Sequence, residues 1–235
     1  MIDTCAVIQA RMGSTRLPGK IFKKINGITV LDCLFEQLKY SHNLKRKIIA
    51  TTLNIEDDKI LEFGKIKNID VFRGSSLDVL DRFYQCAKKN NLKNIIRITS
   101  DCPLIDPYVI DEVIVKYELN NYDYVSNFFK TRCPSGLEVE IFSIECLENV
   151  WINAKDYDRE HVTSYIYKNP DKFKIGYIEG KRSFNDLHLS VDTLKDLDFI
   201  KKIYQRCSSK PITFNQILQI ISSNPSILNY NNSKI

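Results

Sequence analysis

No stretch of the 235-residue sequence approaches the ~20 consecutive apolar residues that a membrane-spanning helix needs. The N-terminal residues also lack the charged region and the apolar run of a signal peptide, so we expect a cytoplasmic protein with no membrane partner. The net charge of +5 is spread along the chain and does not form the basic stripe that nucleic-acid binding requires. This balance predicts no nucleic-acid partner and favours an anionic small-molecule substrate.

Paired cysteine motifs are absent as well. The seven cysteines form no C-x-x-C pair and are odd in number, which argues against a zinc site or a disulfide framework. Most of them stand among apolar residues, where reduced thiols of the core are expected. Cys102 is the exception, because it follows Asp101, a candidate site residue.

Glycine is scarce, with eight residues, and neither common glycine-rich phosphate motif is present. Five residues separate Gly13 from Gly19-Lys20 where a P-loop has four, and Ile21 stands where that motif needs a hydroxyl residue. Gly13 and Gly19 also do not form the G-x-G-x-x-G pattern of dinucleotide-binding folds. Both of these nucleotide-binding classes are therefore excluded.

The chain does contain a loop with three cations, two hydroxyls and two glycines within ten residues, directly after an apolar run at residues 5–8. The loop reads Gln9-Ala10-Arg11-Met12-Gly13-Ser14-Thr15-Arg16-Leu17-Pro18-Gly19-Lys20. Cationic side chains and backbone donors can converge here on several phosphate oxygens, which predicts the binding of a nucleoside triphosphate. The alternative is a solvated connection between two elements.

Short apolar runs alternate with helical patterns in the first half of the sequence. Strands are predicted at 5–8, 47–51, 70–74 and 94–99, and helices at 30–38, around 60–63, at 77–89 and from Pro107, with Asp106 as its N-cap. This order predicts an α/β fold with a mostly parallel, Rossmann-like sheet that is covered on both faces. A ligand is then expected beyond the carboxyl ends of the strands.

The alternation changes after about residue 127. Strands are predicted at 137–141, 173–178 and 187–191, and helices at 143–154, 158–167, 194–207 and 214–222. We expect one domain over residues 1–235, with a nucleotide-binding half at about 1–127, an inserted lobe at about 128–180 and a C-terminal part at about 187–223. In this scheme the lobe is a lid or a dimer contact, and strand 187–191 returns to the main sheet.

Two acidic residues follow predicted strands, Asp101 after 94–99 and Asp192 after 187–191. Each residue also has an explanation without a ligand: Asp101 can stabilise a turn before proline, and Asp192 can cap the helix that follows. Thr193 and Asp196 already form a T-x-x-D capping pair, which leaves Asp192 free for another role. Two carboxylates at strand ends suit a magnesium ion that completes its coordination with water and phosphate.

Two further segments carry polar candidates. Arg73 ends the strand at 70–74, where it can donate hydrogen bonds to a base or a phosphate. Ser75 and Ser76 follow it, and the alternative for them is the N-cap of the next helix. In Arg159-Glu160-His161-Val162-Thr163, the ordinary interpretation of His161 is a hydrogen-bonded neighbour, with a catalytic role as the alternative.

In order along the chain, these motifs resemble the cytidylyltransferases that activate acidic sugars, the CMP-Kdo and CMP-acylneuraminate synthetases, and most of all the spore-coat-polysaccharide type. The resemblance extends from residue 8 to about 198. The segments that carry it are 8–20, Phe72-Arg73-Gly74-Ser75, 99–106, 159–163 and Val191-Asp192-Thr193. The resemblance implies a GT-A-like nucleotide-diphospho-sugar transferase fold. It also implies CTP as co-substrate, Mg²⁺ as cofactor, dimerisation through the inserted lobe and a role in polysaccharide or glycan biosynthesis.

The same resemblance assigns roles by position. The implied nucleotide-binding residues are Ala10, Arg11, Gly13, Ser14, Arg16, Lys20, Arg73 and Ser75. The implied metal ligands are Asp101 and Asp192, and the catalytic candidates are Arg11, Arg16, Lys20 and Asp101. The candidates for contacts with the acceptor are Glu138, Glu140, Arg159 and His161. Cys133 and Glu138 differ from the aromatic residue and the aspartate that relatives often carry there, so the identity of the acceptor stays open.

The expected reaction is transfer of CMP from CTP to a hydroxyl of a sugar acid, with release of pyrophosphate. No histidine is placed near the first loop, so activation of the hydroxyl by the metal is favoured over general-base catalysis. Two alternatives remain at this point. In the first, the acceptor is a sugar 1-phosphate or another phosphorylated metabolite. In the second, the protein is a nucleotide or sugar sensor without catalysis, and the presence of the two carboxylates argues against it.

Overall fold

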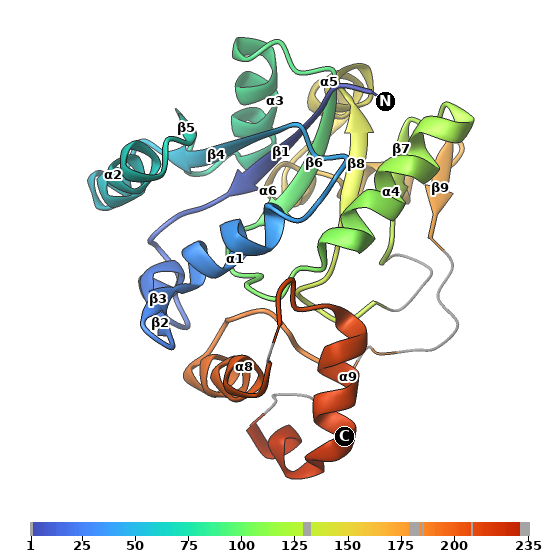
Figure 1. Cartoon of the computed structure of the whole chain (residues 1–235). Helices are drawn as coiled ribbons and strands as arrows, with labels where there is room; N and C mark the ends of the chain where they lie inside the picture. Colours follow the sequence, from blue (N-terminus) through green and yellow to red (C-terminus); the bar gives the residue numbers. More distant parts are fainter. Residues whose placement is uncertain (1, 129–132, 179–183, 185, 208, 231–235) are drawn as a thin grey trace.

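The computed structural model describes residues 2–128, 133–178, 184, 186–207 and 209–230, and its centre is a seven-stranded sheet (Figure 1). The strands of this sheet are β1 (Thr4–Gln9), β4 (Arg46–Thr52), β5 (Asp70–Gly74), β6 (Asn94–Thr99), β7 (Tyr124–Ser126), β8 (Glu140–Ser143) and β9 (Ile175–Tyr177). Their order is β5-β4-β1-β6-β8-β7-β9. The four strands from β5 to β6 are parallel, β8 is antiparallel to β6 and β7, and β9 is parallel to β7. The predicted α/β fold with a mostly parallel sheet is confirmed.

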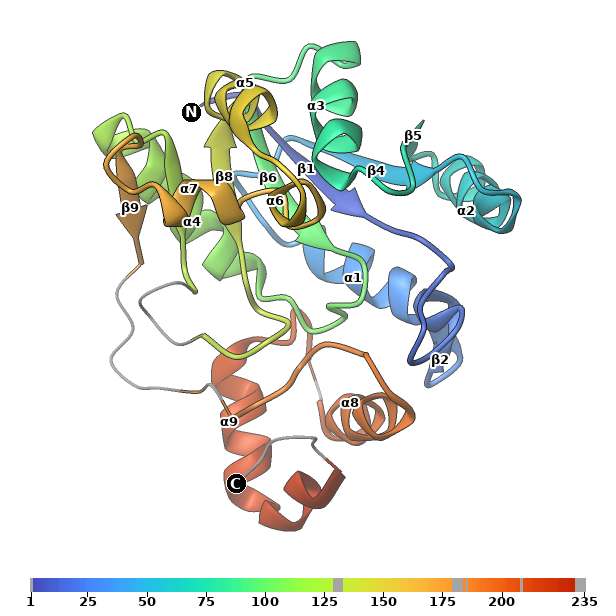
Figure 2. The ribbon, with the colours of Figure 1, turned by 180° about the vertical axis from the view of Figure 1, so that it is seen from behind.

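Helices cover both faces of the sheet, as Figures 1 and 2 show from opposite sides. The core on one face includes α1 (Val30–Leu38), α2 (Asp58–Lys67) and α4 (Pro107–Asn120), and the core on the other includes α3 (Val79–Lys89) and α5 (Ile144–Asn153). Further helical segments are α6 (Tyr157–Glu160), α7 (Ser164–Lys168), α8 (Leu194–Arg206), α9 (Phe214–Ser223), η1 (Lys20–Phe22), η2 (Ile55–Asp57) and η3 (Pro225–Tyr230). A hairpin of β2 (Lys24–Ile25) and β3 (Ile28–Thr29) follows η1. Along the described ranges, no helix has both the length and the apolar character needed to cross a membrane.

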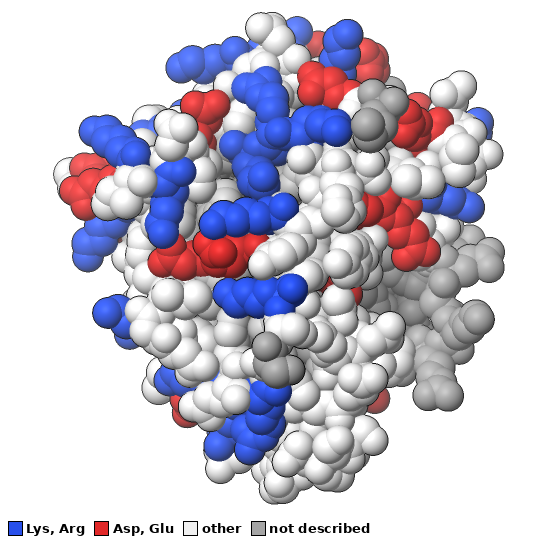
Figure 3. Space-filling view, viewed as in Figure 1, with Lys and Arg blue, Asp and Glu red and all other residues white. Residues whose placement is uncertain are grey.

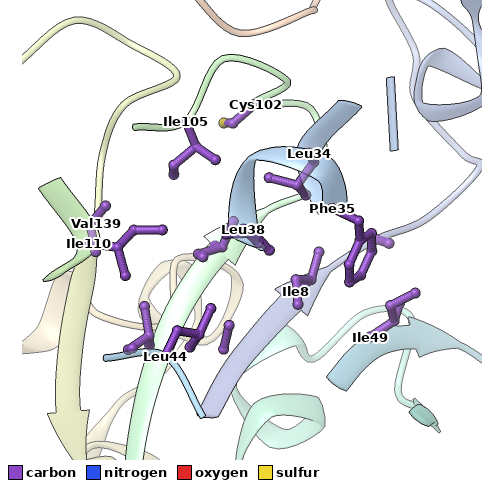
Figure 4. Close-up of a cluster of buried hydrophobic side chains, with 14 of the residues drawn as sticks. Ile8, Leu34, Phe35, Leu38, Leu44, Ile49, Cys102, Ile105, Ile110 and Val139 are labelled. Atoms are coloured by element: carbon purple, nitrogen blue, oxygen red, sulfur yellow. The ribbon is translucent and has the colours of Figure 1, made fainter. Parts of the chain in front are cut away.

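The inner strand β1 is buried on both faces, as expected for a strand with parallel neighbours on each side. Ala6 and Ile8 belong to the core beneath α1 and α4, whereas Cys5 and Val7 belong to the core beneath α3 and α5, because side chains alternate along a strand. Figure 4 shows Ile8 among side chains of α1 such as Leu34. The outer surface on this side of the sheet carries mixed positive and negative charges (Figure 3).

Capping residues set where several helices begin. Asp106 accepts a hydrogen bond from Tyr108 N at 2.9 Å and caps α4, as predicted from the sequence. α3 begins at Val79, two residues later than predicted. The reason is that Asp78 is its N-cap and accepts a hydrogen bond from Asp81 N at 2.8 Å.

The predicted strand at 187–191 does not join the sheet, which corrects the sequence prediction. A single bridge connects His188 with Ser135, and Leu189 N donates to Ser135 O at 2.6 Å. Leu189 and Val191 are buried in a third apolar cluster with residues of α8 and α9. The apolar pattern of the segment therefore reflects packing under these two helices, which a sequence pattern cannot distinguish from pairing in a sheet.

Two strands of the segment predicted as an inserted lobe, at about 128–180, lie in the central sheet. β8 pairs with β6, and β9 pairs with β7. The helix predicted at 158–167 is interrupted between α6 and α7, where Val162 has a φ of 34°. The segment thus extends the sheet through β8 and β9 while its short helices pack beside them.

Gln37 of α1 joins the C-terminal helices to the rest of the core. Its buried amide donates to Ile105 O at 2.9 Å and to Ile212 O at 2.6 Å, and accepts from Ile212 N at 2.9 Å. Ile212 lies directly before α9. One side chain therefore satisfies backbone groups from two segments that are distant in sequence.

We expect Gln37→Leu to lower the free energy of unfolding by at least ~2 kcal/mol, because each buried backbone group left unpaired costs about 1–3 kcal/mol. Urea denaturation measures this change. Gln85→Leu, at an exposed position of α3, is the control and should stay within about 0.5 kcal/mol of the wild type. An equal effect of both substitutions would contradict the role of Gln37.

Candidate active site

Two adjoining cavities lie at the carboxyl ends of β1 and β6, the place predicted for a ligand. The smaller has a volume of about 200 Å³ and the larger about 600 Å³. The residues that line both cavities are Gln9, Arg16, Lys20, Thr99, Asp101 and Asp192. The two cavities thus meet at a shared wall that contains both candidate metal ligands and two of the predicted cations.

Lys20 connects the two carboxylates on this wall. Its ammonium donates to Asp101 Oδ2 and, at 2.8 Å, to Asp192 Oδ1. Arg16 Nη2 lies 2.9 Å from the same oxygen of Asp192. The structure therefore brings together four residues that the sequence singled out, from positions up to 176 apart in the chain (192 − 16).

The pKa values of Lys20 and Asp101 are coupled through this contact. Burial by itself would lower the pKa of Lys20, but the carboxylates of Asp101 and Asp192 outweigh burial and raise it above 10.5. Burial likewise favours the neutral form of Asp101, but the charge and hydrogen bond of Lys20 hold its pKa below 3.8. Both residues are therefore charged at neutral pH.

A backbone hydrogen bond places Asp192 beside Asp101. Val191 N donates to Asp101 O at 2.8 Å, so the segment before Asp192 is tied to the turn that follows β6. Thr193 and Asp196 form the capping box of α8. The predicted cap is confirmed, and the side chain of Asp192 is free to face the cavities.

The first loop contributes Arg11, Ser14, Thr15 and Arg16 to the smaller cavity. Its conformation depends on Asp57, a fully buried residue that accepts a hydrogen bond from Met12 N at 2.6 Å and another from the Thr52 hydroxyl. Sequence analysis missed Asp57, because its position at the start of a helix has an ordinary explanation in the helix dipole.

The two glycines and Ala10 support this loop by their backbones. Gly19 has a φ of 65°, where other residues are strained, whereas a Cβ at Gly13 would meet only Glu56 Oε1, at 2.9 Å and on an exposed side chain that can move aside. Ala10 is buried, and its N donates to Ala50 O at 3.2 Å. None of these three residues lines either cavity.

Arg73 and Ser75 do not reach the two cavities. Arg73 donates to Thr52 O and Asn54 O, both at 2.8 Å, and pairs with Asp58 at 2.7 Å, so its guanidinium holds the connection from β4 to α2. The Ser75 hydroxyl accepts from Asp78 N at 3.0 Å, and the helix cap is Asp78 itself. The alternative of a cap at Ser75 or Ser76 is therefore wrong.

Arg82 is a buried polar residue that sequence analysis missed. It is fully buried on α3, and one guanidinium nitrogen donates to Ser75 O. Its Nε and Nη2 have no hydrogen-bond partner among the described residues. Burial and the nearby charge of Arg11 lower its pKa to about 10.

The larger cavity includes three of the four candidates for contacts with the acceptor. Glu140 pairs with Arg97 at 2.6 Å and accepts from the Tyr124 hydroxyl at 2.6 Å. Glu138 accepts from Gly136 N at 2.5 Å. Burial raises the pKa of Glu138 above its ordinary value of 4.5, and Asp101 and Glu140 add to this effect.

The other two candidates differ in position. His161 lines the larger cavity and packs against the ring of Tyr157, with 4.1 Å between ring centroids. Arg159 lies outside both cavities. It pairs with Asp78 at 2.6 Å and donates to Trp151 O at 2.9 Å, and thereby connects α6 to α3 and α5.

Cys102 lines the larger cavity as a buried thiol. Its Sγ lies 3.0 Å from the Thr99 hydroxyl and 3.6 Å from Asp101 Oδ1. Burial and the charge of Asp101 raise its pKa well above 9.0, which keeps it from acting as a thiolate nucleophile. All seven cysteines are free, as predicted.

Asp101 and Asp192 suit a divalent cation that needs few protein ligands. Among the described residues, no cluster of three or more His, Cys, Asp or Glu side chains is arranged to hold a metal. Mg²⁺ commonly binds through one or two carboxylates, with water and substrate phosphates completing its octahedron. The two carboxylates on the shared wall fit that requirement.

Comparisons with known proteins show the family to which the chain is related. A family model described as Cytidylyltransferase matches residues 5–232. The chain is 39% identical over 230 residues to an uncharacterized protein of Methanocaldococcus jannaschii, covering 97% of this chain and 93% of that protein. It is 32% identical to the spore coat polysaccharide biosynthesis protein SpsF of Bacillus subtilis, over 96% of each chain.

A shorter match and a solved structure extend the comparison. The 3-deoxy-manno-octulosonate cytidylyltransferase of Solibacter usitatus is 33% identical over 135 residues, which cover 57% of this chain and 52% of that protein. The structure of a cytidylyltransferase from Leptospira borgpetersenii superposes with a TM-score of 0.93 at 34% identity, covering 100% of this chain and 99% of that one.

We expect Glu138→Gln to change how the free energy of unfolding depends on pH. The folded protein holds the carboxyl proton more tightly than the unfolded chain, so wild-type stability is lost as the pH rises above 4.5 toward the folded pKa. In Glu138→Gln no proton is lost at this position, so this pH-dependent loss of stability is absent. Chemical denaturation at about pH 4 and about pH 7 should show the variant gaining relative to the wild type at the higher pH.

The control for this comparison is Glu62→Gln, which removes the same charge from an exposed position of α2. Its pH dependence should follow the wild type. If Glu138→Gln also followed the wild type, the assignment of a buried, destabilised carboxylate would be wrong.

Proposed function

The chain belongs to the cytidylyltransferase family, and on this premise we propose that it transfers CMP from CTP to a hydroxyl of a sugar acid and releases pyrophosphate. The observation that carries the proposal is the wall shared by the two cavities, where Lys20 pairs with Asp101 and Asp192. One cavity is lined by the cationic loop, and the other by polar side chains such as Glu138 and His161.

The smaller cavity suits the triphosphate. Arg11 and Arg16 supply guanidinium groups, and Ser14 and Thr15 supply hydroxyls, around a space of about 200 Å³. Fixed cations of this kind stabilise the negative charge that develops on departing pyrophosphate. The buried Asp57 holds the backbone of this loop through Met12 N, which fixes the positions from which these mostly exposed side chains extend.

Asp101 and Asp192 would hold the magnesium ion of the proposed reaction. When bound, the ion supplies positive charge that makes the α-phosphorus more electrophilic. Lys20 pairs with both carboxylates and Arg16 pairs with Asp192, so two positive charges offset the two like charges that stand close together. Lys20 therefore keeps Asp101 ionised, and its contacts hold both carboxylates in place for the ion.

The larger cavity suits a polyhydroxylated acceptor. Ser135, Ser190 and His161 offer hydrogen-bonding groups, and Glu138 adds a carboxyl group. An acceptor here faces the nucleotide across the shared wall, as attack in line with the leaving pyrophosphate requires. In the step, the hydroxyl oxygen bonds to the α-phosphorus, the bond from that phosphorus to the bridging oxygen breaks, and the hydroxyl proton leaves to solvent.

The choice of a sugar acid rests on relatives. The Solibacter usitatus protein is named for 3-deoxy-manno-octulosonate, a sugar acid, and the Bacillus subtilis protein for spore coat polysaccharide biosynthesis. We propose the same substrate class for this chain and a role in polysaccharide biosynthesis. Dimerisation and the cytoplasmic location stay predictions, as do nucleoside contacts of Arg73 and Ser75.

A pyrophosphate-release screen tests this proposal. We expect turnover with CTP, Mg²⁺ and a sugar acid such as 3-deoxy-manno-octulosonate, and little with ATP, GTP or UTP. Mass spectrometry should find one phosphate in the product. A product with two phosphates would show a phosphorylated acceptor, and turnover restricted to UTP or ATP would overturn the assignment of cytidine.

Matched variants connect the screen to the site. Asp192→Asn should abolish most pyrophosphate release, since it removes a carboxylate that we place on the metal. Asp198→Asn removes the same charge from an exposed position of α8 and should leave turnover near the wild-type rate. If the wild type bound CTP but showed no turnover with sugar acids or sugar phosphates as acceptors, this result would support a sensor without catalysis.

A further inference from the structure

The turn at 133–138 and the segment at 187–192 approach each other at Gly136 more closely than side chains allow. Gly136 has a φ of 95°. A Cβ at this position would lie 2.4 Å from the carbonyl carbon of Leu189 and 2.5 Å from Ser190 N. Both are backbone atoms, so the contact has no flexible side chain that could move aside.

Hydrogen bonds surround this close approach. Leu189 N donates to Ser135 O at 2.6 Å, and the hydroxyls of Ser135 and Ser190 lie 3.0 Å apart. One residue further, Val191 N donates to Asp101 O at 2.8 Å. The segment is thus fixed on one side by the turn and on the other by the residue that carries the first carboxylate.

Asp192 follows this fixed segment directly. Residues 187–191 form no ladder with the sheet, so Asp192 is positioned by the bridge at His188, by these hydrogen bonds and by contacts with the C-terminal helices. The last include the packing of Leu189 and Val191 under α8 and α9 and a hydrogen bond from Asp192 N to Asp196 Oδ2 at 3.1 Å. From there Asp192 Oδ1 reaches Lys20 Nζ at 2.8 Å and Arg16 Nη2 at 2.9 Å. A small shift of the segment would break both ion pairs and separate the two carboxylates.

We propose that Gly136 is a positioning residue for the metal-binding pair, because its missing side chain lets the segment at 187–192 bring Asp192 beside Asp101. The inference rests on the proposed role of these two carboxylates. Ser135, Gly136 and Ser190 also line the larger cavity, so one contact shapes the acceptor side and sets the carboxylate pair.

The test is Gly136→Ala, with Gly27→Ala as matched control. Gly27 has a φ of 93°, but a Cβ there would meet nothing within 4 Å. The control therefore introduces the same backbone strain without the close contact, in the β2–β3 hairpin outside both cavities.

Two readouts separate a positioning role from general destabilisation. In crystals without nucleotide, Asp192 of Gly136→Ala should lie away from Lys20 and Arg16, whereas Gly27→Ala should keep the wild-type ion pairs. Paramagnetic resonance of Mn²⁺ in the presence of CTP should show a loss of about 10–100-fold in metal affinity for Gly136→Ala only.

An unmoved Asp192 or an unchanged Mn²⁺ affinity in Gly136→Ala would overturn the inference. If this variant fails to fold, Ser190→Ala removes the hydroxyl contact at 3.0 Å and should show the same displacement to a smaller degree. If Asp192 kept its wild-type position in Ser190→Ala, the inference would be overturned. A wild type that binds no Mn²⁺ with CTP would refute the metal site itself, and the crystal distances would still decide the role of Gly136.

Discussion

The site depends on one electrostatic constraint, the pairing of a single ammonium group with two carboxylates. Asp101 and Asp192 come together from distant parts of the chain, and without Lys20 between them their like charges would favour protonation of one acid. Lys20 removes that penalty, and the two acids in turn keep it charged despite burial. Lys20 and Asp101 thus hold each other in their charged forms, and Asp192 is bound to the same ammonium group.

These three residues lie in three different kinds of structure. Lys20 ends a loop that leaves β1, and Asp101 stands in the turn after β6, the parallel neighbour of β1. Asp192 arrives on a segment outside the sheet, fixed by backbone hydrogen bonds. All three residues line both cavities, so the two spaces meet at this group of charges.

Sequence patterns predicted what local chemistry determines. The buried strand β1, the cap at Asp106 and the Thr193–Asp196 capping box each depend on neighbours in the chain, and each is confirmed. Residues 187–191 were misassigned, because burial against helices gives the same apolar pattern as a strand. The contacts of Arg73 with Thr52, Asn54 and Asp58, and of Arg159 with Asp78, join elements that are separate in the sequence, and no sequence pattern reveals such contacts.

The most direct test of the account is a crystal structure with CTP and Mn²⁺, in which anomalous scattering locates the metal. The account predicts Mn²⁺ bound by Asp101 and Asp192, with the triphosphate against Arg11 and Arg16 in the smaller cavity. A metal bound elsewhere, or a triphosphate outside this cavity, would contradict it.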